Sequence, residues 1–290
     1  MTGGSLPDPR RNAYRGDLAA ESLRGLVEAE RYAKGEPRQV SLPTLPVRRE
    51  PRFDATLDTE ALLGEIVTLY DEREGWAWVQ SSRDFYVGYM PSDGLSRKIV
   101  TSTHRIAALR TYVYPEPDGK TPPLALLSLN ALIAVKGKQG RFLILADGGH
   151  VFAGHAVPIG AYARDFVTVA EGFLGTPYLW GGRTSVGLDC SGLVQLALEA
   201  AGRAAPRDAD MQAAELGRAV DSMRKLRRGD LVFWEGHVGI MTSKTELLHA
   251  NAFHMAVEAE PFARARKRIE RLGYQVTGIR RLPGYRQFRR

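Results

Sequence analysis

Cysteine is almost absent from this sequence of 290 residues, since Cys190 is the only one. An intramolecular disulfide is therefore impossible, and there is no second thiol with which to build a cysteine-rich metal site. The sequence also lacks HExxH and similar paired-ligand motifs. We therefore expect neither a metal nor another cofactor.

Long apolar runs are lacking as well. No stretch approaches the roughly 18 to 20 apolar residues that cross a bilayer as a helix. The first residues, MTGGSLPDPRRNAYRGDL, contain no apolar core of a secretory signal. A lone thiol fits a reducing compartment, because disulfides are typical of oxidising ones. The sequence thus favours a cytoplasmic protein with no membrane partner.

Acidic residues are outnumbered, 33 against 40 Lys and Arg, which gives a formal net charge of +7. The excess lies late in the chain, in ARARKRIER (263–271), Arg280, Arg281, Arg286, Arg289 and Arg290. No aromatic residues are interleaved in this run to stack on bases. We interpret it as a solvated basic helix face and tail, and expect no nucleic-acid partner.

The order of sequence patterns predicts several domains. Leu18, Leu23, Leu26 and Val27 recur near helical spacing before Gly35, which predicts a helix over 17–34 within an N-terminal arm, residues 1–40. Short β-type runs such as EIVTLY, GWAWVQ and FYVGYM predict a small β-barrel at 41–98, and a second set predicts another at 99–158. From residue 159 to 290, helical patterns precede antiparallel strands, which indicates an α+β domain.

The segment GLDCSGLVQLALEAAG (187–202) predicts a helix that begins at Cys190. The N–H groups and the dipole of a helix start favour an anion, so we expect a lowered thiol pKa and an oxyanion site there. Most free cysteines are merely small buried apolar residues. The neighbouring Asp189 and Ser191 and the glycine-rich turn YLWGG (178–182) favour a nucleophile instead.

A thiol nucleophile needs a base, and the base needs a residue that orients it. Among the six histidines, His237 begins the strand pattern HVGIMT and His249 lies in LLHAN. A hairpin centred on residue 243 would place these two directly opposite each other, with Cβ atoms about 4.5–5.5 Å apart. His237 is then the candidate base and His249 the candidate orienting residue. His104, His150, His155 and His254 show no such pattern.

The runs PYLWGGRTSVGLDCSGLVQLAL, GDLVFWEGHVGIM and LLHAN together resemble the NlpC-type, papain-like cysteine peptidases of bacterial cell-wall metabolism. With GEIVTLYDEREGWAWVQ and YVGYM in front, which resemble bacterial SH3-like domains, the chain is most similar to the dipeptidyl-peptidase VI subgroup. That resemblance implies a γ-D-glutamyl-L-diamino acid endopeptidase. Its substrates would be murein peptides with a free N-terminal L-alanine, its product L-Ala-γ-D-Glu, and its role cell-wall peptide recycling.

The resemblance also assigns residues. It implies Cys190 as nucleophile, His237 as base and His249 as orienting residue. It implies further substrate contacts on both sides of the nucleophile: Tyr178 and Trp180 beside the thiol, Asp189 and Ser191 flanking it, and Asp208 in PRDADMQ (206–212) binding the substrate amine. Ala209 stands where the subgroup often has serine.

The first barrel is expected to supply a wall that blocks longer peptides, with Glu65 and Tyr86 or Tyr89 as candidates. The two tyrosines can equally well be interpreted as residues of the barrel core. Glu65 can be interpreted as an ordinary exposed charge on a strand. Two other functions remain open: another thiol-dependent murein amidase or acyl-transfer enzyme, and a non-catalytic cell-wall-binding protein.

Overall fold

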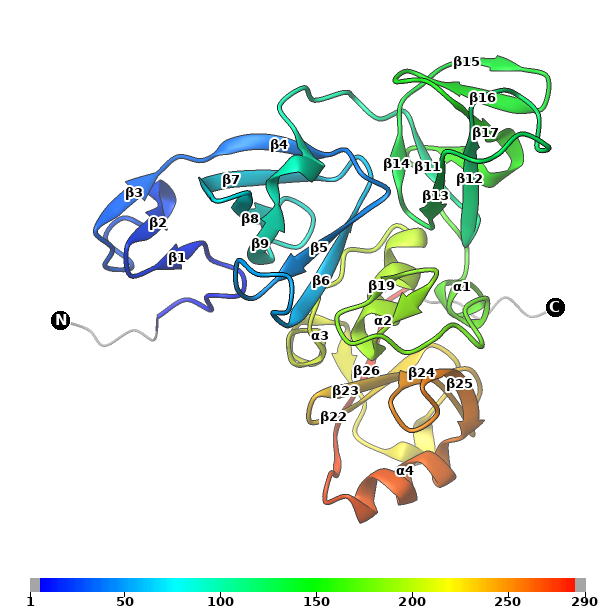
Figure 1. Cartoon of the computed structure of the whole chain (residues 1–290). Coiled ribbons are helices and arrows are strands. Elements are labelled where there is room, and N and C mark those ends of the chain that lie inside the picture. The colour runs from blue at the N-terminus through cyan, green and yellow to red at the C-terminus, as the bar shows by residue number, and fades with distance from the viewer. Residues whose placement is uncertain (1–5, 285–290) are drawn as a thin grey trace. The chain divides into compact units, whose positions relative to one another are not determined.

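The computed structural model describes residues 6–284 of the chain, so Arg286, Arg289 and Arg290 lie outside the described residues. All elements below belong to that range. The chain divides between Ile159 and Gly160 into two compact units, called the first and the second unit (Figure 1). None of the helices in residues 6–284 combines the length and the apolar character needed to cross a bilayer.

The predicted helix over 17–34 is wrong. This segment instead forms a small sheet with a 3₁₀ turn at Glu21–Leu23; its strands are β1 (Tyr14–Arg15), β2 (Leu18–Ala20) and β3 (Arg31–Ala33). Gly25 breaks any helical path with a φ of +84°. Leu18 and Val27 are buried in one cluster with Trp78, whereas Leu26 is 65% exposed. The apolar spacing therefore serves packing on the first barrel and not a helical stripe.

A seven-stranded antiparallel sheet follows, in the order β10-β4-β7-β8-β9-β5-β6. Its strands are β4 (Glu36–Val40), β5 (Thr44–Arg48), β6 (Leu57–Leu62), β7 (Ile66–Arg73), β8 (Trp76–Ser81), β9 (Val87–Pro91) and β10 (Leu95–Ser96), with a 3₁₀ turn at Ser92–Gly94. Alternate residues such as Leu45 and Val47 point into one core with Met90. This is the barrel-like arrangement that the short alternating runs predict.

The rest of the first unit holds two further sheets, with orders β13-β12-β17-β16-β15 and β14-β11-β18. Their strands are β11 (His104–Ile106), β12 (Arg110–Tyr114), β13 (Ala125–Ser128), β14 (Leu132–Ile133), β15 (Val135–Gln139), β16 (Phe142–Leu145), β17 (His150–Phe152) and β18 (Ala156–Pro158), with a 3₁₀ turn at Ala153–His155.

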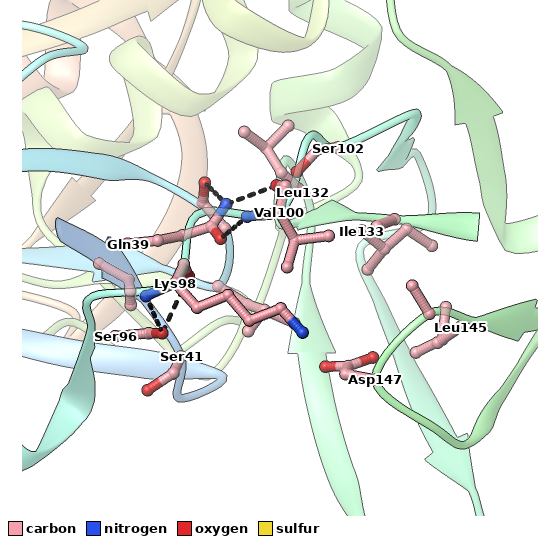
Figure 2. Close-up of a pocket in the computed structure, with 15 residues that line it drawn as sticks. Gln39, Ser41, Ser96, Lys98, Val100, Ser102, Leu132, Ile133, Leu145 and Asp147 are labelled. Atoms are coloured by element: carbon pink, nitrogen blue, oxygen red, sulfur yellow. Dashed lines mark hydrogen bonds between the residues drawn. The ribbon is translucent and has the colours of Figure 1, made fainter. Parts of the chain in front are cut away.

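A cavity of about 220 Å³ lies within the first unit, between the residues of these two sets of strands (Figure 2). The amide of Gln39 spans its inner side: Nε2 donates to the carbonyls of Gly64 (3.1 Å) and Val100 (3.0 Å), and Oε1 accepts from the N–H of Val100 (2.8 Å). Lys98 and Asp147 both line the cavity, and the side chain of Lys98 extends toward Asp147 (Figure 2). Gln39 therefore ties the connection between the two sets of strands to the first sheet.

The second unit pairs helices with a six-stranded sheet of order β21-β26-β22-β23-β24-β25. The helices are α1 (Phe166–Glu171), α2 (Cys190–Ala200), α3 (Ala209–Glu215) and α4 (Phe262–Arg271), with a 3₁₀ turn at Met223–Lys225. The sheet strands are β21 (Arg218–Ala219), β22 (Asp230–Trp234), β23 (His237–Met241), β24 (Glu246–Asn251), β25 (Ala256–Pro261) and β26 (Val276–Arg281), and β19 (Arg183–Thr184) pairs with β20 (Gly187–Leu188). The predicted helix start at Cys190 and the antiparallel strands that follow are confirmed.

Two helices flank this sheet. The helix α2 lies against β23 and β24 (Figure 1). The helix α4 packs Phe262 and Ala265 into a cluster with Trp234, Met241 and Leu247. The basic run ARARKRIER is therefore a helix with one apolar side, as its composition suggested.

Replacing Gly64 by Ala should destabilise the first unit more than Gly75→Ala does. Both glycines have φ near +80°, but a Cβ on Gly64 would lie 2.6 Å from the carbonyl oxygen of Leu132, whereas Gly75 faces open space. Left-handed backbone alone costs about 1–2 kcal/mol, and overpacking adds about 1–3 kcal/mol. Urea unfolding of the full chain, followed by tryptophan fluorescence, measures both losses. Equal losses would contradict this account.

Candidate active site

Cys190 is the first residue of α2, and its side chain is 7% exposed. The preceding Asp189 caps the helix: its Oδ1 accepts the N–H of Gly192 at 2.7 Å. A carboxylate at this position satisfies one of the unpaired N–H groups of a helix start. The local sequence Asp-Cys-Ser-Gly therefore fixes where the helix begins and so where the thiol lies.

The thiol rests against the backbone on either side of His237. Its Sγ lies 3.9 Å from the carbonyl oxygen of Gly236, and the N–H of Val238 forms a hydrogen bond to it. The tight connection from β22 to β23, in which Trp234 pairs with His237, sets this geometry. Gly236 provides the turn with a φ of +67°.

His237 and His249 meet in a direct hydrogen bond, with 2.8 Å between Nε2 of His237 and Nδ1 of His249. The predicted register, however, is wrong by two residues. The ladder pairs Ile240 with Leu248 and Met241 with Leu247, so the histidines are diagonal and not directly opposite. A shift of two residues keeps both side chains on one face, and diagonal partners stay within reach of an aromatic ring.

Beyond His249 the line of contacts continues to Glu260 on β25. Nε2 of His249 lies 3.0 Å from Oε1 of Glu260, which is 5% exposed. Arg268 of α4 donates to both oxygens of this carboxylate, to Oε2 at 2.7 Å. The guanidinium stacks 4.2 Å from the centre of the Phe253 ring. Sequence reasoning missed Glu260 and Arg268, although the alternation in AVEAEP beside LLHAN is a signal for inward-facing acids.

Burial changes the resting state of the thiol. Desolvation and then the charge of Asp189 raise the pKa of Cys190 to about 12, although the N–H groups of Val238 and Ser191 and the charge of Arg207 lower it. The expectation of a lowered thiol pKa is therefore wrong. The N–H groups that stabilise a thiolate are present. The free energy lost by removing the thiolate from water, however, exceeds the free energy gained from these hydrogen bonds.

Both histidines are uncharged for the same reason. Burial, followed by the proximity of His249 and Arg268, lowers the pKa of His237 to about 3. Burial also lowers the pKa of His249, against the opposing hydrogen bond from Glu260. The resting pair is thus a neutral thiol beside a neutral imidazole. Such a pair can transfer its proton only as the sulfur attacks an electrophile.

Asp189 and Ser191 are buried and hydrogen-bonded within the second unit. The buried Arg207 donates to Oδ1 and Oδ2 of Asp189 at 3.0 and 2.6 Å, and to Oγ of Ser191 at 2.9 Å. The N–H of Gly181 also donates to Asp189, at 3.0 Å. Sequence reasoning missed Arg207, which lies directly before the predicted Asp208 and carries no motif of its own.

Three other predicted residues, Tyr178, Trp180 and Asp208, lie in the second unit. Tyr178 is half-buried, and burial followed by the charges of Cys190 and Asp189 raises the pKa of its hydroxyl, which therefore stays protonated. Trp180 is 60% exposed on the following turn. Asp208 is half-buried at the residue that precedes α3.

The three first-barrel candidates lie in the other unit. Glu65 is buried and pairs with Arg83 at 3.3 Å. Tyr86 is 4% exposed, in keeping with barrel core. The hydroxyl of Tyr89 accepts a hydrogen bond from Arg15 at 3.0 Å. Each of them therefore has a place within the first unit.

One group of potential metal ligands occurs in the described range: donor atoms of His249, His254 and Glu260 lie within 4.8 Å of one another. These side chains already have protein partners. Arg268 holds Glu260, and Asn251 Oδ1 lies 3.0 Å from Nδ1 of His254. A cation here would have to compete with the guanidinium, which makes this a poor site for a resident metal.

Comparison with known proteins matches two segments of this chain to two family models. The NlpC/P60 family model matches residues 175–267, and the bacterial dipeptidyl-peptidase SH3 domain matches 47–95. A γ-D-glutamyl-L-lysine dipeptidyl-peptidase of Bacillus subtilis is 31% identical over 228 residues, which cover 71% of this chain and 76% of the relative. One of the same name from Bacillus cereus is 27% identical, over 71% of this chain and 70% of the relative. The fold resembles the crystal structure of an NlpC/P60 family protein from B. cereus, with a TM-score of 0.72, 22% identity and coverage of 85% of this chain and 99% of that one.

Alkylation of the free enzyme by iodoacetamide should be slow at pH 7 and should rise about tenfold per pH unit between pH 6 and 9. The reason is that a thiol with a pKa near 12 has a thiolate fraction that grows in this way throughout that range. Since Cys190 is the only cysteine, intact-mass spectrometry reads the rate directly. The urea-unfolded chain is the control and should level off above about pH 8.5. A plateau of the folded rate below pH 8 would show a thiolate–imidazolium pair and contradict the burial argument.

Proposed function

The chain belongs to the NlpC/P60 family and is a cysteine peptidase, and from this premise we propose that it cleaves the γ-D-glutamyl–diamino acid bond of murein peptides. Its substrate would carry a free N-terminal L-alanine, and its product would be L-Ala-γ-D-Glu. The relatives named γ-D-glutamyl-L-lysine dipeptidyl-peptidase support this bond and this dipeptide product. The similarity to each covers 71% of this chain, which is more than the second unit alone.

The observation that carries the proposal is the placement of Cys190 at the start of α2, against the backbone that bears His237. We assign Cys190 as nucleophile, His237 as base and His249 as the residue that orients the base. Nδ1 of His237 is the nitrogen left for the thiol, because Nε2 is bonded to His249. The thiol thus rests against the backbone on either side of the proposed base, and a hydrogen bond joins that base to the proposed orienting residue.

In this assignment the sulfur attacks the γ-carbonyl carbon of D-glutamate while its proton passes to Nδ1 of His237. The C–N bond then breaks, the leaving amine of the diamino acid takes that proton, and a thioester remains. Water adds to the thioester, gives a proton to His237 and releases L-Ala-γ-D-Glu with the thiol restored. The backbone N–H at the start of α2 and the protonated hydroxyl of Tyr178 are the proposed oxyanion donors.

Recognition of the free amine is the finer part of the proposal. Asp208 precedes α3 and follows Arg207, which is anchored to Asp189 near the thiol. An ammonium held away from water needs a carboxylate partner, and Asp208 is our candidate. Ala209 lacks the hydroxyl that the subgroup often has beside it. The exposed Trp180 is a candidate lining residue, whereas the bonds of Asp189 and Ser191 to Arg207 favour a supporting role for them.

We further propose the domain limits 41–98 and 99–158 for two SH3-like barrels, and 159–290 for the catalytic domain. Glu65, Tyr86 and Tyr89 remain our candidates for a contribution from the first barrel. A dipeptide-releasing enzyme suits soluble murein fragments, so the proposed role is recycling in the cytoplasm.

The full chain should release L-Ala-γ-D-Glu from L-Ala-γ-D-Glu-L-Lys and from its meso-diaminopimelate counterpart. Acetylating the N-terminal amine of either peptide should lower kcat/KM at least about 100-fold, since an amide cannot offer a carboxylate the charged donor that an ammonium offers. Mass spectrometry of the products checks this and also separates peptidase from amidase or transpeptidase products. Cys190→Ala should be inactive. Equal cleavage of the free and acetylated peptides would contradict the amine requirement.

Asp208→Asn should lower kcat/KM about 10- to 100-fold on the free-amine peptide, because a charge-assisted hydrogen bond is lost. The slow cleavage of the acetylated peptide should change little. Asp210→Asn, an exposed position in α3, is the matched control and should leave both rates near those of the unaltered chain. A parallel loss on both peptides would remove Asp208 from the amine site.

A further inference from the structure

The buried Glu260 ends the line of hydrogen bonds that begins at His237 and passes through His249. We propose that Glu260 is a positioning residue, which fixes the protons on His249 and His237 so that Nδ1 of His237 keeps its lone pair for the thiol. This inference rests on the proposed role of His237 as base. It concerns a residue two side chains away from the sulfur.

The first step is the state of the carboxylate. Arg268 donates to both oxygens of Glu260, and a guanidinium has only donors to offer. Both oxygens are therefore acceptors. Burial by itself would raise the pKa of Glu260, but the hydrogen bonds from Arg268 and His249 lower it to about 2. At neutral pH the group is an acceptor-only carboxylate.

The proton positions on the histidines follow from this. Since Oε1 of Glu260 accepts, Nε2 of His249 must carry a proton to fill the 3.0 Å contact. A neutral imidazole has one proton, so Nδ1 of His249 is an acceptor. The 2.8 Å contact then requires a proton on Nε2 of His237. Nδ1 of His237 is left unprotonated, which is the form that a base needs.

The effect works through hydrogen bonds more than through charge. Arg268 lies as close to Glu260 as His249 does, so the net charge of the ion pair is near zero. Glu260 raises the pKa of His249, whereas Arg268 lowers the pKa of both histidines. Two other titratable residues lie nearby: Nδ1 of His254 is 4.0 Å from Oε1 of Glu260, and Glu258 is the ladder partner of His249. What Glu260 supplies is therefore the direction of the two hydrogen bonds.

Glu260→Gln tests the proposal on the full chain. Arg268 will take the amide oxygen, so the NH₂ group faces His249 and reverses both hydrogen bonds. Nδ1 of His237 then carries the proton and cannot act as base. We expect kcat to fall about 10²- to 10⁴-fold with KM within about threefold, since a wrong imidazole tautomer costs a serine protease triad about 10⁴ in kcat.

The direct readout is the tautomer state, seen in long-range ¹H–¹⁵N correlation spectra of histidine-labelled protein. The unaltered chain should show Nε2–H on both His237 and His249, and Glu260→Gln should show Nδ1–H on both. This readout needs no substrate. Failure of the proposed peptide to react, with these tautomers in place, would therefore sink the proposed function and leave this inference standing.

Three further variants separate positioning from mere structural support. Glu258→Gln, on the same strand, should keep tautomers and kcat, and Glu260→Asp should restore most of the activity that Glu260→Gln loses. Arg268→Lys keeps a charged donor on the carboxylate and so keeps Glu260 an acceptor; the tautomers should persist and kcat should fall less than tenfold. Nδ1–H on His237 in the unaltered chain overturns the proposal, as does an unchanged kcat in Glu260→Gln. If Glu260→Gln does not fold, the tautomers of the unaltered chain and of Arg268→Lys test the proposal in its place.

Discussion

The carboxylate of Asp189 is the interaction on which the catalytic unit depends. It caps α2 through Gly192, receives the N–H of Gly181 and is held on both oxygens by the buried Arg207. Three stretches of chain meet there: the turn with Tyr178 and Trp180, the helix that starts at Cys190, and the segment that leads to Asp208. Removing one partner of such a buried pair typically costs about 3–5 kcal/mol. One ion pair thus positions the proposed nucleophile, an oxyanion donor and the amine-binding candidate together.

A second buried ion pair, Glu260 with Arg268, performs the same task for the proposed base in our proposal. The strand β25 brings Glu260 beside β24, and α4 folds back so that Arg268 reaches it. The apolar side of α4 holds the helix in place through Phe262 and Ala265. The basic run therefore does more than solvate the surface, because one of its arginines completes the polar network behind His249. Burying a polar group costs free energy unless the group has hydrogen-bond partners. In this network each buried side chain is a hydrogen-bond partner of the next one.

The sequence predicts the catalytic unit well where local signals decide the structure. The local sequence predicts a helix start at Asp189, Cys190 and Gly192. The turn at Gly236 bounds the strand of His237. The register of His249 fails because it depends on turn chemistry: Oγ of Ser243 accepts the N–H groups of Thr245 and Glu246, which moves the hairpin centre.

Predictions that depend on distant packing also fail. The expected N-terminal helix fails because Leu18 and Val27 are buried with Trp78, far along the chain. Arg207, Glu260 and Arg268 were missed because no local motif marks them and their partners, 8 to 18 residues away, lie on other segments. Similarity to known proteins establishes the family and one SH3-like domain, and the second barrel rests on strand pattern alone.

The neutral resting pair explains why proton direction matters in this site. In an enzyme that rests as a thiolate and an imidazolium, both ring nitrogens of the base carry protons, and no tautomer has to be chosen. Here burial raises the pKa of Cys190 to about 12 and lowers the pKa of His237 to about 3, so the sulfur gives up its proton only during attack. At that moment Nδ1 of His237 must already hold a lone pair. Burial of the thiol therefore creates the need for tautomer control, and the carboxylate of Glu260, held as an acceptor by Arg268, is placed to meet it.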